Sequence, residues 1–350
     1  MDGSHTDDVV PIDHGGDLAA ARLLFPHAPQ PFVDLSTGIN PYAYPVPPLG
    51  PDLFTRLPEA APLEQLAAIA AEAYGAPSAA HVVAAPGTQI LLAPVAGLVQ
   101  PGRAAVLGPT YAEHLRAAAQ GGHRVEEVAD VASLQGADLA VVVNPNNPDG
   151  RIVPREILLA CAHALPLGGL LVIDEAFMDV VPGASLAGDV GHRNIVVLRS
   201  FGKFFGLAGL RLGFALADPA IAARLRATLG PWAVAGPAIA IGTAALADRS
   251  WAAATRARLA EASLRLDRAL ADAGLAVVGG TSLFRLVRTH AAGELFEHLG
   301  RAGILVRRFA NDASWLRFGL PASEPDWQRL AAVLASFGGS PRRRRAPPRR

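Results

Sequence analysis

The chain has 350 residues, of which 51% are hydrophobic, and its 31 basic side chains balance its 31 acidic ones. A net charge of zero gives no overall attraction to nucleic acid or to an anionic membrane, so we expect neither as a partner. The single cysteine, Cys161, excludes an intramolecular disulfide and fits a reducing compartment. The N-terminal residues lack the basic start and apolar core of a secretory signal, and the longest uncharged window contains two prolines. We therefore expect a soluble, cytoplasmic protein with two domains.

The N-terminal part of the chain has few regular elements. Residues 1–16 are expected to form a mobile arm, and Asp17 can cap a short helix that ends at Leu24. Residues 42–51 are rich in proline and are not expected to form a regular element. Apolar side chains at helical spacing predict a helix over 62–74.

Beyond residue 80 the pattern alternates between short apolar strands and helices. The strands are rich in β-branched residues, which is typical of strands covered on both faces, and are predicted at 81–84, 104–107, 139–143, 170–173, 194–198 and 212–217. Helices are predicted near 88–99, 111–120 and 154–163, and Pro94 should kink or shorten the first of them. This order predicts a mostly parallel α/β sheet, which binds ligands beyond the carboxyl ends of its strands.

The last third of the chain has the pattern of a smaller α+β domain. After a long helix over 251–273, strands are predicted at 276–278, 283–287, 304–306 and 315–318, with helices at 293–302 and 324–336. The basic, proline-rich C-terminus is expected to be a disordered tail. The predicted domains are an arm with part of the small domain (1–50), a large domain (51–255), the rest of the small domain (256–338) and the tail (339–350).

Lys203 lies in a segment rich in glycine and aromatic residues, 199–213, between two predicted strands. We expect a packed loop in which burial disfavours the charged form of the lysine, and an uncharged amine can condense with an aldehyde. The hydroxyl of Ser200 and the guanidinium of Arg211 would suit a phosphate monoester. A lysine alone is more often a surface residue, but the three together suggest pyridoxal 5'-phosphate (PLP), an aldehyde that carries a phosphate.

Four further sites fit around one PLP molecule. Asp174 follows an apolar strand and is either a helix cap or the partner that keeps the pyridine nitrogen protonated. Asn147 lies in a turn rich in Asn and Pro, where its amide could bind the phenolic oxygen of the ring. Tyr111 is either a stacking partner of the ring or an ordinary half-buried aromatic residue. The start of the predicted helix near residue 88 offers free backbone amides to a phosphate, from Gly87, Thr88 and Gln89.

Over roughly residues 30–335 the chain resembles the fold-type I PLP enzymes related to aspartate and histidinol-phosphate aminotransferases. The most specific motifs are 144–150, 174–177 and 200–203, with Arg211. The resemblance implies a three-layer large domain, a small α+β domain built from the N-terminal segment and the C-terminal third, and a homodimer with the site near the subunit interface. It implies catalytic roles for Lys203, which would bind the aldehyde of PLP, and for Asp174 and Tyr111. The cofactor-binding residues that it implies are Gly87, Thr88, Gln89, Tyr111, Asn147, Asp174, Ser200, Lys203 and Arg211.

Two departures from the aminotransferase pattern bear on the reaction and on the dimer. Phe177 stands where those enzymes carry a tyrosine that donates to the phenolic oxygen of PLP, which argues against routine transamination. Leu57 stands where those enzymes carry a tyrosine that reaches the phosphate in the neighbouring subunit.

Within the family, the motifs 14–17, 34–41, 174–179 and 199–209 resemble the threonine-phosphate decarboxylases of cobalamin biosynthesis. This resemblance implies decarboxylation of L-threonine O-3-phosphate to (R)-1-amino-2-propanol O-phosphate, with Lys203 returning a proton to Cα. The candidates for substrate binding are Arg317, Arg307, His14, Gly38, Asn40 and Asn147. Which arginine binds the carboxylate and which the phosphate stays open. The alternatives are a histidinol-phosphate aminotransferase and a PLP-fold protein without catalysis, while the absence of HxH and HExxH motifs disfavours a metal enzyme.

Overall fold

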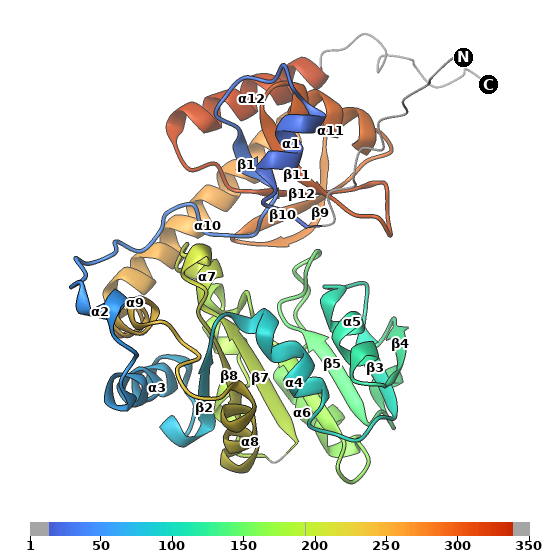
Figure 1. The fold of residues 1–350 in the computed structure, drawn as a ribbon. Helices are drawn as coiled ribbons and strands as arrows, with labels where there is room; N and C mark the ends of the chain where they lie inside the picture. The colour runs from blue at the N-terminus through green and yellow to red at the C-terminus, as the bar shows by residue number, and fades with distance from the viewer. Residues whose placement is uncertain (1–13, 193, 339–350) are drawn as a thin grey trace, which may run out of the picture. The chain divides into compact units, whose positions relative to one another are not determined.

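A computed structural model describes residues 14–192 and 194–338 of the chain (Figure 1). The expected N-terminal arm lies largely, and the expected basic tail wholly, outside these residues. The chain divides into two compact units, one formed by residues 42–259 and the other by the segments before residue 42 and after residue 259. The boundaries predicted from the sequence were at residues 50 and 255.

The first unit is built on a seven-stranded sheet with the strand order β2-β8-β7-β6-β5-β3-β4. The strands from β7 to β4 are parallel to their neighbours, and β8 runs antiparallel to both β2 and β7. Their bounds are β2 (Val82–Ala85), β3 (Arg103–Leu107), β4 (Arg124–Val128), β5 (Leu139–Val143), β6 (Leu170–Asp174), β7 (Ile195–Ser200) and β8 (Gly213–Ala217). The mostly parallel α/β sheet expected from the sequence is therefore confirmed.

Both faces of this sheet are buried. Alternate residues such as Val141 and Val172 pack in one apolar cluster with the helices α4 (Leu92–Ala96), α5 (Glu113–Gln120) and α8 (Pro219–Leu229). The residues between them in the strands, such as Val142 and Ile173, are also buried. This double burial explains the continuous apolar runs of the central strands. The remaining helices of the unit are α2 (Asp52–Thr55), α3 (Ala60–Tyr74), α6 (Arg155–Ala164), α7 (Phe201–Phe204) and α9 (Gly236–Ala247).

The second unit joins the N-terminal segment to the C-terminal third. Its five-stranded sheet has the order β1-β11-β12-β10-β9, in which β1 runs parallel to β11 and the other pairs are antiparallel. A Cβ on Gly300 would come within 2.2 Å of the Phe25 ring, so this close contact depends on glycine. The elements are α1 (Leu18–Leu24), β1 (Val33–Leu35), β9 (Ala276–Thr281), β10 (Phe284–Arg288), α11 (Ala292–Arg301), β11 (Ile304–Arg308), β12 (Trp315–Gly319) and α12 (Glu324–Gly338). The helix α10 (Arg249–Asp272) runs from the first unit into the second.

Two local features differ from the predictions, at Lys203 and at β4, while the expected shortening of a helix by Pro94 is confirmed. Lys203 lies in the short helix α7 and not in a loop. The helix expected over 88–99 is a 3-10 turn, η2 (Thr88–Leu91), followed by α4, which contains Pro94 and ends at Ala96. The proline has no amide hydrogen to continue the helical bonding, which accounts for the short, broken form. The strand β4 was missed because it is a charged edge strand and not an apolar one.

Within the described part of the chain, no helix has both the length and the apolar character needed to cross a membrane.

Candidate active site

The structure brings five predicted residues of the first unit to one edge of its sheet. The strands β2, β3, β5, β6 and β7 point in the same direction, so the segments after their carboxyl ends lie at a common edge. Asp174 is the last residue of β6, and the other four follow the ends of β2, β3, β5 and β7, namely Gly87, Tyr111, Asn147 and Lys203.

Lys203 is held by a helix that starts directly after β7. A Cβ on Gly202 would lie 2.7 Å from Cα of Ala208, so α7 packs tightly on the next turn, η7 (Ala208–Leu210). The rings of Phe201 and Phe205 stack at 4.3 Å between centroids, and Phe205 in turn stacks on Trp251 at 5.5 Å. Lys203 itself is partly exposed, between these buried neighbours. Its backbone is therefore fixed while its side chain is accessible for chemistry.

Asp174 is a buried carboxylate with a histidine partner. A hydrogen bond of 2.8 Å joins Asp174 Oδ2 and Nε2 of His114, and both side chains are almost fully buried. The other oxygen, Oδ1, accepts the backbone N–H of Ala176 at 2.9 Å. His114 was not among the residues predicted from the sequence. It lies three residues after Tyr111, and the turn between them places the two ring centroids 6.0 Å apart. This pair can hold a proton on a ring nitrogen placed against Asp174.

A cradle for an anion surrounds Gly87 and Arg211. Gly87 has a φ of +85°, which other residues adopt only with strain, and a Cβ there would lie 2.7 Å from Nη2 of Arg211 and would displace the guanidinium. A Cβ on Gly213 would lie 2.6 Å from the backbone nitrogen of Thr88. Ser200, at the end of β7, pairs with Gly213 in the sheet. Gly87, Thr88, Ser200 and Arg211 thus lie close together, and a guanidinium, a hydroxyl and backbone amides are a donor set that fits the phosphate of PLP.

Tyr111 belongs to a chain of side-chain hydrogen bonds. Its hydroxyl donates to Oε1 of Gln89 at 2.9 Å, and Nε2 of Gln89 donates to Oε2 of Glu113 at 3.1 Å. Burial and then the carboxylates of Glu113 and Asp174 raise the pKa of Tyr111 to about 12. Tyr111 therefore stays neutral at physiological pH. Gln89 is exposed, and its side-chain amide is hydrogen-bonded to both Tyr111 and Glu113.

The remaining candidates lie in the second unit. Arg317, on β12, is 6% exposed, its Nη2 donates to the carbonyl oxygen of Ser36 at 2.8 Å, and its guanidinium lies 5.1 Å from the centre of the Phe284 ring. Burial and the neighbouring charge of Arg307 lower the pKa of Arg317 to about 9, against the opposite effect of Asp34. Arg317 is therefore charged at neutral pH and is suited to an anionic ligand.

The N-terminal motifs converge on the same part of the second unit. The backbone N–H of Gly16 donates to Oγ of Ser36 at 2.7 Å, and a Cβ on Gly15 would lie 2.4 Å from the carbonyl oxygen of Ser36. That carbonyl is the acceptor for Arg317. Arg307 pairs with Arg317 across β11 and β12, His14 is exposed, and Gly38 and Asn40 are buried. The segments that carry the motifs 14–17 and 34–41 thus meet next to Arg317.

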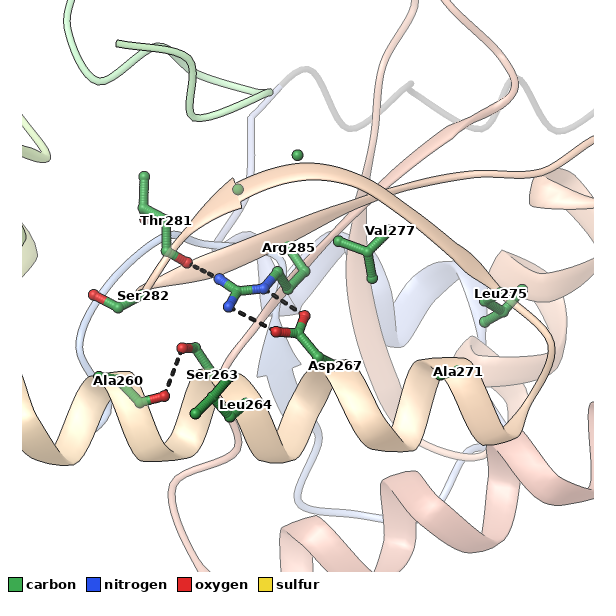
Figure 2. Close-up of a pocket in the computed structure, with 12 residues that line it drawn as sticks. Ala260, Ser263, Leu264, Asp267, Ala271, Leu275, Val277, Thr281, Ser282 and Arg285 are labelled. Carbon is green, nitrogen blue, oxygen red and sulfur yellow. Dashed lines mark hydrogen bonds and ion pairs between the residues drawn. The ribbon is translucent and has the colours of Figure 1, made fainter.

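A separate groove of the second unit contains none of the predicted site residues. It lies between α10 and the β9–β10 hairpin, as Figure 2 shows, and is lined mainly by small and apolar side chains. Its two charged groups, Asp267 and Arg285, are paired with each other, at 2.6 and 2.9 Å. We therefore do not place the active site in this groove.

Comparisons with known proteins agree with this geometry. The family described as aminotransferase class I and II matches residues 61–334. A threonine-phosphate decarboxylase of Pseudomonas aeruginosa is 42% identical over 93% of this chain and 98% of its own length. A histidinol-phosphate aminotransferase of Mycobacterium bovis is 36% identical over 68% of each chain. A crystal structure of histidinol-phosphate aminotransferase from Sinorhizobium meliloti with pyridoxal-5'-phosphate has a TM-score of 0.78, 23% identity, and coverage of 97% of this chain and 98% of that one. The chain belongs to the class I and II aminotransferase family.

Proposed function

We propose that the chain is a PLP-dependent decarboxylase that converts L-threonine O-3-phosphate to (R)-1-amino-2-propanol O-phosphate for cobalamin biosynthesis in the cytoplasm. The observation that carries the proposal is the 42% identity to a threonine-phosphate decarboxylase over nearly the whole of both chains. The relative named histidinol-phosphate aminotransferase matches a smaller share of the chain, at 36% identity over 68%. Aminotransfer to histidinol phosphate is therefore the second candidate.

The residues of the first unit supply a place for each part of PLP. When bound, PLP offers an aldehyde to amines and a ring that accepts the electron pair left when CO₂ departs. Arg211, Ser200 and the amides at Gly87 and Thr88 would bind the phosphate, and Tyr111 would stack on the ring. Asp174, supported by His114, would hold a proton at the ring nitrogen, and Asn147 would donate to the phenolic oxygen.

Lys203 would be the residue whose Nζ amine holds the aldehyde of PLP. With substrate bound, Nζ would carry, as an ammonium, the proton that takes the place of the departing carboxylate at Cα. The position of Lys203 on the fixed helix α7 supports this role. Phe177 is buried and carries no hydroxyl that could donate to the phenolic oxygen.

The substrate has two anionic groups, and the second unit has two arginines for them. Arg317 is buried and cationic, and Arg307 faces it across β11 and β12. We assign the pair to the carboxylate and the phosphate of the substrate, with His14, Gly38 and Asn40 around them. Binding of the remote phosphate would help to orient the substrate so that the bond to the carboxylate, and not Cα–H, lies perpendicular to the ring.

A substrate panel tests the reaction. Purified protein with PLP and L-threonine O-3-phosphate should release CO₂ and form the aminopropanol phosphate, without a need for 2-oxoglutarate. Transfer of the amino group of glutamate to a keto acid, with no release of CO₂ from threonine phosphate, would instead establish an aminotransferase. Lys203→Ala should lose both the visible absorbance of bound PLP and the activity.

The surface of the first unit supports a homodimer. Phe54 and Leu57 are 66% and 64% exposed, and Leu57 lines a groove with Pro58 and Ile239. Large apolar side chains exposed beside a groove are typical of a surface that another protein covers. We propose a second copy of this chain as the partner.

A further inference from the structure

The segments after β3 and β5 are joined by side chains. These two strands are parallel neighbours, paired from Ala104 with Leu139 to Val106 with Val141. Their carboxyl ends therefore lie next to each other. The segment after β3 carries Tyr111, and the segment after β5 carries Asn147. The relative position of these two residues depends on how the segments are held together.

Asn146 connects the two segments. The residue is fully buried, and its Oδ1 accepts the hydroxyl hydrogen of Thr110 at 2.6 Å. Its Nδ2 donates to the carbonyl oxygen of Pro109 at 3.0 Å and to Oδ1 of Asp149 at 2.8 Å. Two of these three bonds cross from one segment to the other. The amide thus uses its oxygen and its nitrogen in bonds that a differently shaped side chain would lose.

Arg151 adds a second connection between the same segments. Its Nη2 donates to the carbonyl oxygen of Gly108 at 2.8 Å, and its Nη1 donates to Oδ2 of Asp149 at 3.1 Å. Asp149 is also the acceptor for Asn146, so the two connections share one carboxylate. The side chains of Thr110, Asn146, Asp149 and Arg151 thus form one hydrogen-bonded cluster between the two segments.

We propose that Asn146 is a positioning residue that fixes Tyr111 relative to Asn147 through its bond to Thr110. Thr110 directly precedes Tyr111 and Asn146 directly precedes Asn147, so the bond joins the two residues one peptide away from each. The proposal rests on the proposed use of PLP, in which Tyr111 stacks on the ring and Asn147 bonds the phenolic oxygen. Loss of the bond would let the stacking face and the amide shift against each other, and a displacement of about 1 Å in a site costs about a hundredfold in rate.

Asn144 is a matched control in the same turn. It is also fully buried, and its side chain also makes two hydrogen bonds, to the carbonyl oxygen and from the backbone N–H of Val153, at 3.2 and 2.8 Å. Both bonds stay within the segment after β5. A change at Asn144 therefore weakens this segment without touching the connection to Tyr111.

The test uses four single variants of the whole chain, Asn146→Ala, Thr110→Val, Thr110→Ser and Asn144→Ala, and the double variant of the first two. Three quantities are measured for each: the dissociation constant for PLP, the pH midpoint of the visible absorbance change of bound PLP, and the melting temperature without PLP. Thr110→Val replaces only a hydroxyl by a methyl group at a partly exposed position, so it keeps the test valid if Asn146→Ala does not fold. Thr110→Ser keeps the hydroxyl and should behave as the wild type.

We expect Asn146→Ala and Thr110→Val each to weaken PLP binding by about tenfold and to shift the pH midpoint, because loss of the bond lets Tyr111 and Asn147 shift against each other. Their double variant should bind PLP no more weakly than the more affected single variant, since both changes remove the same bond.

Asn144→Ala, the control, should lower the melting temperature and leave the pH midpoint unchanged. An equal shift of the pH midpoint in Asn144→Ala, or no shift in Asn146→Ala and Thr110→Val, would overturn the role of Asn146. The proposed cofactor would stand in that case, provided that the wild type binds PLP. A wild type that binds no PLP would overturn both the role of Asn146 and the proposed cofactor.

Discussion

Arg317, which we propose binds the substrate, is a buried charge that costs the fold stability. Burial, and then the charge of Arg307, lower its pKa to about 9. A base with a lowered pKa binds its proton less well in the folded state, so the charge destabilises the fold at all pH values below about 9. This destabilisation is lost as the pH rises above about 9, toward the higher pKa of an arginine in the unfolded chain.

Arg317→Met should therefore melt no lower than the wild type when no ligand is present, because an apolar side chain of similar length replaces a buried charge. L-threonine O-3-phosphate should raise the melting temperature of the wild type and not of this variant. Calorimetry with and without the ligand measures both effects. Arg288→Met, at a side chain that is 60% exposed, is the control and should keep the response to the ligand. A clear loss of stability in Arg317→Met without ligand would contradict this account.

Tyr111 gives a pH prediction of the opposite kind. Its pKa is raised to about 12 by burial and by Glu113 and Asp174, so the folded state holds the phenolic proton more tightly than the unfolded chain does. This stabilisation is present below pH 10 and is lost as the pH rises from about 10 through 12. The ultraviolet absorbance of tyrosinate should show one fewer group titrating above pH 11 in Tyr111→Phe than in the wild type. A difference that titrates near pH 10 would contradict the prediction.

At the scale of elements, a buried ion cluster joins the ends of β6 and β7. Arg199 is 2% exposed, and its guanidinium donates to Glu175 at 2.9 Å and to Asp179 at 2.5 Å. Burial alone would lower the pKa of Arg199, but Asp179 and Glu175 outweigh it and raise that pKa. Glu175 follows Asp174 in the chain, and Arg199 precedes Ser200. The cluster thus supports the strand ends that carry the proposed ring and phosphate contacts.

Glu175→Gln should lower the free energy of unfolding by about 3 kcal/mol, because it leaves part of a buried charge without its partner. Glu324→Gln should cost under about 1 kcal/mol, since its bond to Arg265 is largely exposed, at 56% and 42%. Urea denaturation followed by circular dichroism measures both values. Similar small losses in the two variants would show that the buried cluster does not hold these strands.

At the scale of the whole molecule, the proposed homodimer makes a prediction about mass. Leu57→Asp places a charge among exposed apolar side chains, so it should convert a dimer to a monomer and weaken PLP binding. Leu23→Asp is the control, because Leu23 is 84% exposed in the other unit and should leave the mass unchanged. Sedimentation velocity measures the mass of each. A wild type that sediments as a monomer at micromolar concentration would rule out this interface.

Much of the architecture could be predicted from local patterns. The strand β5 was predicted with its observed bounds, 139–143, because five buried apolar residues in a row suit only a covered strand of this length. The helix α1 begins after its predicted cap, with the Asp17 side chain accepting the N–H of Ala20 at 2.9 Å. The polar edge strand β4 could not be predicted in this way, since its extended form depends on pairing with β3 and not on an apolar pattern of its own.

By itself, the sequence determined the fold class, most of the strands along the chain and the candidate residues at their carboxyl ends. These features depend on contacts close in the chain, on hydrophobic periodicity and on motifs that the family shares. The tertiary structure decided which side chains meet. His114 reaches Asp174 over 60 residues, and Asn146 reaches Thr110 over 36. Such bonds form only where parallel strands bring distant segments to one edge of the sheet, so no local pattern in the chain can encode them.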